Sequence, residues 1–128
     1  MADEITVSLK MFAENGNYVS SRTTLNRKLD QAAAGERGGI QNIGTTEETL
    51  DSTGLTTPGL LFVENLDTTN YVEIGVLDGG SYRNMGRLVA GESAEAGGMC
   101  LIPVAPSVTV QLKANTAACN VRYAWLEA

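Results

Sequence analysis

Apolar and polar residues alternate from the start of the chain. Ile5, Val7, Leu9 and Met11 alternate with Thr6, Ser8 and Lys10. A period of two is typical of a half-buried β-strand. Residues 14–17 (Glu-Asn-Gly-Asn) then favour a tight hairpin turn. Residues 18–31, rich in Ser, Thr and Arg, are predicted to be extended and mostly solvated.

The middle of the chain is less regular. Glycines at 35, 38 and 39 leave no room for a helix after the three alanines at 32–34, so residues 32–39 are predicted to be a loop. Residues 40–50 contain several β-branched side chains and predict one strand, and residues 51–58 have the composition of a turn.

The second half predicts strands separated by turns. Residues 60–63 are continuously apolar, which favours a central strand covered on both faces. Further strands are expected at 71–76, 82–89, 99–104, 108–113 and 119–125. About eight strands, with turn signals every ~8–12 residues, predict an all-β fold, an antiparallel β-sandwich that is jelly-roll-like. Residues 1–128 are expected to form a single domain, with residues 1–4 as a flexible N-terminal arm.

Composition excludes several classes of function. The net charge is −6, and the nine basic residues are scattered, so no nucleic-acid footprint is visible. The longest nearly apolar run, residues 99–105, is far shorter than the ~20 residues of a membrane helix. The acidic N-terminus does not resemble a signal peptide, and synthesis in the cytoplasm is expected. Cys100 and Cys119 lie in apolar runs and are expected to be reduced, buried thiols.

The chain carries little equipment for catalysis. It has no histidine, the commonest general base and metal ligand. Glu47, Glu48 and Asp51 lack the spacing of a calcium loop. Glu64 and Glu73 remain as a carboxylate pair that could face each other across a hairpin, although outward-facing glutamates are far commoner. We therefore expect no enzymatic activity, no metal and no cofactor.

One segment carries a family resemblance. Residues 59–76, GLLFVENLDTTNYVEIGV, resemble a recurring segment in small virion proteins of tailed bacteriophages. Three flanking pieces are similar as well: QNIGTTEETL (41–50), RLVAGES (87–93) and KANTAACNVRYAWLEA (113–128). With the opening strand, the resemblance covers about two-thirds of the chain.

The resemblance implies a structural protein of the virion, a capsid decoration or cement protein located on the capsid surface. Its expected partners are the major capsid protein and further copies of the same chain, with a homotrimer favoured because it matches local threefold positions of a capsid. The candidate contact residues lie in the N-terminal arm and in the loop at 31–39: Met1, Ala2, Asp3, Glu4, Gln31, Gly35 and Arg37.

Two other functions stay open at this point. The chain could be a tail or head–tail junction protein of the same virion. It could also be a host-surface or carbohydrate-binding module, for which Tyr18, Tyr71 and Tyr82 are the available aromatic residues.

Overall fold

The computed structural model describes residues 4–31 and 33–127, and these residues form ten antiparallel strands and no helix. The chain divides into two compact units, residues 1–34 and 35–128. The first unit is a two-stranded hairpin, and the second is a sandwich of two four-stranded sheets. The predicted all-β antiparallel sandwich is confirmed. None of the described residues lies in a helix that could span a membrane.

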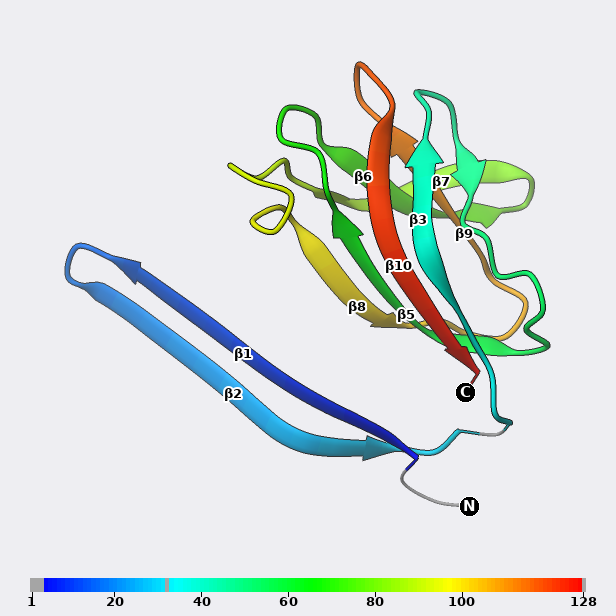
Figure 1. The fold of residues 1–128 in the computed structure, drawn as a ribbon, viewed down its shortest axis with the longest axis horizontal. Helices are drawn as coiled ribbons and strands as arrows, with labels where there is room; N and C mark the ends of the chain where they lie inside the picture. The colour runs from blue at the N-terminus through cyan, green and yellow to red at the C-terminus, as the bar shows by residue number, and fades with distance from the viewer. Residues whose placement is uncertain (1–3, 32, 128) are drawn as a thin grey trace. The chain divides into compact units, whose positions relative to one another are not determined.

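The hairpin consists of β1 (Ile5–Asn15) and β2 (Tyr18–Leu29), the long blue strands of Figure 1. The turn lies at the predicted Asn-Gly pair, where Gly16 has a φ of 61°. A bulge in β2 interrupts the register, because Ser8 lies opposite both Leu25 and Asn26, and Asn26 has a φ of 54°. A single two-stranded hairpin is marginally stable in water. The expectation of one domain over residues 1–128 therefore stays a prediction.

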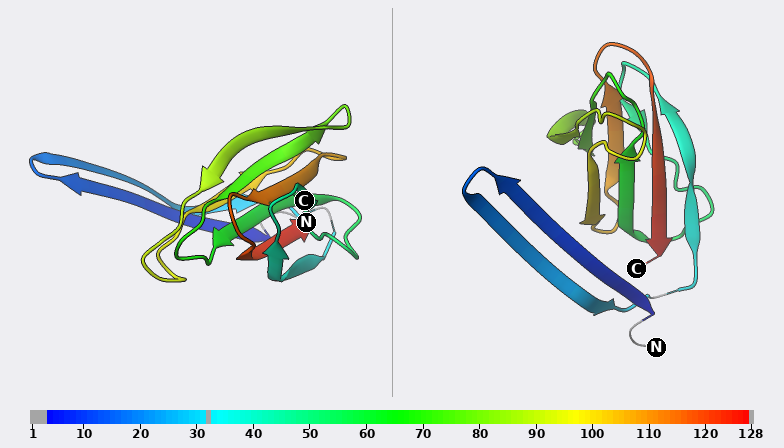
Figure 2. Two further views of the ribbon diagram at one scale, coloured as in Figure 1. Left: turned by 90° about the horizontal axis from the view of Figure 1, so that it is seen from above. Right: turned by 60° about the vertical axis from the view of Figure 1, so that its left-hand side comes forward.

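The first sheet of the sandwich has the order β3-β10-β5-β8, and its strands lie side by side in Figure 1. Its strands are β3 (Glu36–Ile43), β10 (Cys119–Glu127), β5 (Pro58–Asn65) and β8 (Met99–Pro103). The second sheet has the order β4-β9-β6-β7. Its strands are β4 (Glu48–Thr49), β9 (Thr109–Ala114), β6 (Val72–Asp78) and β7 (Ser81–Leu88). The two sheets form the two layers seen in Figure 2.

The core lies between these sheets. The residues that sequence alternation placed inward on the last strand, Cys119, Val121, Tyr123 and Trp125, are all buried. They pack in one cluster with buried side chains from both sheets: Ile43, Leu50, Leu61, Val63, Val72, Ile74, Leu88, Val110, Leu112 and Ala114. This cluster belongs wholly to the sandwich unit.

Two predictions in the middle of the chain are wrong. The loop expected at residues 32–39 ends earlier, because β3 already begins at Glu36. Its glycines fit a strand here: a Cβ at Gly38 would lie 2.9 Å from the carbonyl oxygen of Tyr123, so this strand approaches β10 closely. The single strand expected at 40–50 is two strands, because the chain turns after Ile43 and the Glu48 carboxylate accepts a hydrogen bond from the Gly44 N–H.

Candidate functional site

The hairpin exposes an apolar face of its own. We use the term hairpin face for the side of β1 that carries Ile5, Val7, Leu9, Met11 and Ala13, together with the residues paired with it across β2. Ile5 is buried, but Leu9 is 50% and Met11 62% exposed. The strand predicted from the alternation at 5–11 is confirmed. The burial expected for its apolar side is wrong beyond its first residue, because Ile5 is buried but Leu9 and Met11 are exposed.

Four cations lie on the hairpin strands against a single carboxylate. Residues 5–29 contain one acidic residue, Glu14, and four basic residues, Lys10, Arg22, Arg27 and Lys28. Arg22 and Arg27 lie opposite Met11 and Val7, on the hairpin face. Among the described residues, none of these four cations forms an ion pair. The hairpin face is thus apolar along β1 and carries two arginines along β2, whereas Lys10 and Lys28 lie on the opposite face of the hairpin.

The first sheet of the sandwich has a second exposed apolar face. Strand pairing places Leu126, Leu60 and Pro103 in one row, and Ala124, Phe62 and Leu101 in the next. We call this the outer sheet face. Phe62 is half-buried and Leu101 is exposed. The sequence predicted that the central strand β5 is covered on both faces, and this prediction is wrong because its outer face is only partly covered.

A hollow of about 190 Å³ lies in this outer sheet face. It is lined by one acidic residue and five apolar residues: Glu36, Leu60, Phe62, Leu101, Ala124 and Leu126. Glu36 has no ion-pair partner among the described residues. At the other end of the face, Glu64 pairs with Arg122 at 3.2 Å. The outer sheet face therefore combines an apolar floor with one carboxylate, that of Glu36, beside the hollow, and an ion pair at the other end.

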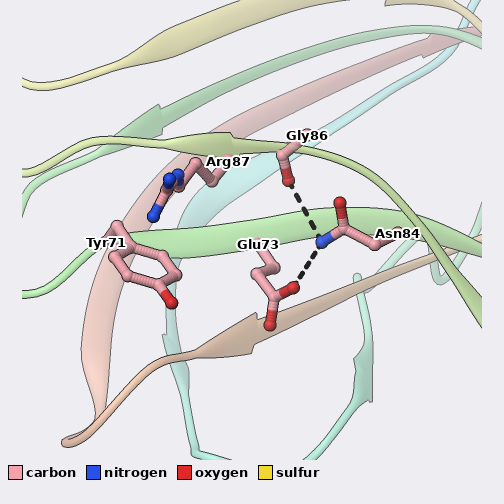
Figure 3. A pocket seen from close by; sticks show the side chains of 5 residues that line it. All are labelled: Tyr71, Glu73, Asn84, Gly86 and Arg87. Atoms are coloured by element: carbon pink, nitrogen blue, oxygen red, sulfur yellow. Dashed lines mark hydrogen bonds between the residues drawn. The ribbon is translucent and has the colours of Figure 1, made fainter.

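The second sheet presents a polar surface instead. A pocket of about 260 Å³ opens beside β6 and β7 and is lined by Tyr71, Glu73, Asn84, Gly86 and Arg87, as Figure 3 shows. The Arg87 guanidinium lies over the Tyr71 ring, 4.7 Å from its centroid. The Asn84 amide donates hydrogen bonds to the Glu73 carboxylate and to the Gly86 carbonyl oxygen. The polar side chains of this pocket therefore already have partners within the pocket.

The two glutamates considered as a carboxylate pair lie on different sheets. Glu64 is on β5 of the first sheet, and Glu73 is on β6 of the second, where its partner is Lys113 at 3.7 Å. Both belong to ion pairs on outward surfaces, so they do not face each other as the sequence had allowed. No cluster of three metal-ligating side chains occurs in residues 4–31 and 33–127.

The candidate contact residues predicted from sequence fall into two groups. Met1, Ala2 and Asp3 lie outside the described residues. Glu4 and Gln31 meet at the base of the hairpin, where the Glu4 carboxylate accepts a hydrogen bond at 3.1 Å from the Gln31 N–H. Gly35 and Arg37 belong to the sandwich unit.

Arg37 is held by an ion pair. Its guanidinium donates to the Asp51 carboxylate, with an Nε–O distance of 2.9 Å. The Thr53 hydroxyl and backbone N–H also donate to Asp51, and together with Arg37 they hold the pKa of Asp51 well below its usual range. Arg37 lies in β3 rather than in a loop, so its side chain is positioned by the sheet.

The apolar outer surfaces were not predicted from the sequence. The unbroken run at 60–63 was a signal for the outer sheet face, because a strand with one solvated face would alternate. No local signal connects Leu60 with Leu126, since only the pairing of β5 with β10 brings them together.

Comparisons with known proteins give no relative. No protein-family model, no curated protein and no solved structure matches the chain.

Proposed function

We propose that the protein is a structural virion protein of a tailed bacteriophage, a capsid decoration protein that binds the major capsid protein and stabilises its lattice. The observation that carries this proposal is the hairpin. Its strands of 11 and 12 residues expose Leu9, Met11, Phe12 and Val19. An isolated hairpin with such residues gains stability by packing against another protein surface. This is the behaviour expected of an arm in an assembly.

The strand pairing supports a jelly-roll body for this protein. In the sandwich β3 pairs with β10, β4 with β9, β5 with β8, and β6 with β7. The first strand thus pairs with the last, the second with the last but one, and so on inward. A long antiparallel ribbon folded over on itself produces this nested order, and an eight-stranded jelly roll is such a ribbon.

Charge and symmetry support the proposed partners. The net charge of −6 favours solubility before assembly. A closed homo-oligomer, for which we propose a trimer, gains avidity because several weak contacts act together on a symmetric lattice. In this proposal the residues that reach the capsid are Met1, Ala2, Asp3, Glu4, Gln31, Gly35 and Arg37.

Sedimentation with capsid shells that lack the protein tests this function. The purified chain should bind saturably, at a simple ratio to the capsid subunits. Arg37→Ala should weaken binding, whereas Arg83→Ala, at an exposed arginine with a 3.8 Å ion pair to Asp78, should not. An absence of binding by the wild-type chain at any ratio would overturn the proposal.

A second candidate function is recognition of a carbohydrate on the host surface. The polar pocket supports it, because Tyr71 offers an aromatic ring beside the amide of Asn84 and the guanidinium of Arg87. The ring is already covered by Arg87, and a sugar would have to displace that contact. Glycan-array binding that is lost in Tyr71→Ala would favour this function over decoration.

A further inference from the structure

We infer that the hairpin face of one copy docks on the outer sheet face of a second copy, so that the protein self-associates by exchanging its hairpins. This inference rests on the proposed function in that it names the surfaces that hold the oligomer together. Its test needs only the purified protein, so its failure is separable from failure of capsid binding.

The two surfaces are similar in chemistry. The hairpin face presents Leu9 and Met11 with half or more of their surface exposed, and the outer sheet face presents Phe62, Leu101 and Leu126 around a hollow. Burying apolar surface from both sides contributes about 25 cal/mol for each Å² removed from water. The hollow offers a place for an aliphatic side chain of the hairpin to insert.

The hairpin strands and the sandwich unit differ in charge, while the first unit taken as a whole, residues 1–34, carries four basic and four acidic residues. The hairpin strands carry four basic residues and one acidic residue. Residues 35–128 carry eleven acidic and five basic residues. On the contact surfaces themselves, Arg22 and Arg27 lie beside the apolar residues of the hairpin face, and Glu36 lies at the edge of the hollow. Opposite charges at the rim favour encounter between different copies and fix their orientation.

The available area favours a reciprocal exchange. A strand of 11 residues is about 36 Å long, and two paired strands are about 10 Å wide. One hairpin on one sheet would therefore bury about 700 Å² over both surfaces, below the ~1,200 Å² of a stable interface. In a closed ring such as the proposed trimer, each copy gives one hairpin and receives another, so it takes part in two contacts that together bury about 1,400 Å². A closed assembly in which every copy gives and receives a hairpin meets this requirement.

The experiment is a measurement of mass in solution, by light scattering after size exclusion, on the full chain and two double variants. The wild type should run at two or more times its monomer mass of 13.5 kDa. Leu9→Glu with Met11→Glu, on the hairpin face, should give monomers. Phe62→Glu with Leu101→Glu, on the outer sheet face, should give monomers as well.

Matched controls carry the same charge on other surfaces. Phe12→Glu with Val19→Glu changes the opposite side of the hairpin, where both residues are more than half exposed. Leu77→Glu with Met85→Glu changes exposed positions on the second sheet. Both controls should keep the wild-type mass. The fluorescence of Trp125, buried in the core, reports for every variant whether the sandwich is folded.

Mixing the two monomeric variants provides the decisive result. The hairpin variant keeps an intact outer sheet face, and the sheet variant keeps an intact hairpin face. Each pair in the mixture can form one contact of about 700 Å², so mixed dimers should be weaker than the wild-type assembly and should appear only at high protein concentration. A monomeric wild type, or an assembly that survives the folded Phe62→Glu, Leu101→Glu variant, would overturn the inference.

Discussion

Thr57 donates two hydrogen bonds to the carboxylate of Glu127, from its backbone N–H at 2.6 Å and from its hydroxyl at 2.9 Å. The backbone N–H of Thr56 donates a third at 2.5 Å. Glu127 is buried, with 4% of its surface exposed. The end of β10 is thereby connected to the turn that precedes β5. A charged acceptor for these amides explains why an acidic residue is tolerated at a buried position.

The stability of the sandwich should fall in acid partly because of Glu127. The amides of Thr56 and Thr57 and the Thr57 hydroxyl hold the pKa of Glu127 below its ordinary value of 4.5. A lowered folded-state pKa contributes stability that is present above pH 4.5 and is lost as the pH falls through the folded value. Glu127→Gln should lower the melting temperature at neutral pH and lessen its fall below pH 4.5. Asp78→Asn, at an exposed carboxylate, serves as the control; equal acid dependence in Glu127→Gln and wild type would contradict this role.

Asn65 should be essential for the loop that follows β5. Its buried amide donates to the carbonyl oxygens of Asn70 and Leu88, both at 2.9 Å, and its side-chain oxygen accepts from the Asp67 N–H. Asn65→Leu leaves these backbone groups without partners and should cost about 3 kcal/mol in the free energy of unfolding. Urea denaturation followed by Trp125 fluorescence measures this loss. Asn42→Leu, on an exposed position of β3, should change the free energy by no more than about 0.5 kcal/mol.

Gly75 should tolerate no side chain. It lies at a bulge between β6 and β7, and a Cβ there would lie 2.2 Å from the carbonyl oxygen of Arg83. Gly75→Ala should therefore destabilise the sandwich by about 1–3 kcal/mol, the usual cost of overpacking. Gly86→Ala is the matched control on β7, because its Cβ would have no neighbour within 4 Å. Denaturation midpoints of Gly75→Ala and Gly86→Ala are compared. Equal midpoints would show that β6 and β7 move apart to accept the Cβ at residue 75 without loss of stability.

Both thiols should react slowly in the folded protein. Burial and the nearby carboxylate of Asp67 raise the pKa of Cys119 to about 11, and burial also raises the pKa of the half-buried Cys100. Few thiolates therefore exist at pH 8, and the thiolate is the reactive form. Titration with a thiol reagent should label two cysteines rapidly only after unfolding. Fast labelling of Cys119 in the native protein would contradict its burial in the core, and fast labelling of Cys100 would contradict its packing against that core.

The sandwich was predictable because its strands follow simple alternation. Val110 and Leu112, or Val121 and Tyr123, bury every second residue against one core. The first half of β3, residues 36–39, was missed because Gly38 and Gly39 are poor strand formers on their own. Pairing with β10 stabilises them there, and such non-local pairing is absent from any short window of sequence.

The candidate surfaces were harder to predict for a related reason. Leu9 and Met11 alternate with polar residues as in a strand that covers a core, yet they are not part of the core of the sandwich. Phe62, Leu101 and Leu126 become neighbours only through the order of strands in the sheet. Sequence pattern identifies strands and their two sides, whereas the exposure of a side depends on what the completed fold leaves uncovered.

The copy number of this chain in purified virions tests the central claim most directly. Quantitative mass spectrometry against the major capsid protein should find hundreds of copies, near the capsid protein count or a simple fraction of it. A handful of copies, in multiples of three or six, would instead place the protein in the tail or connector. Complete absence from the particle would contradict the account of a virion protein.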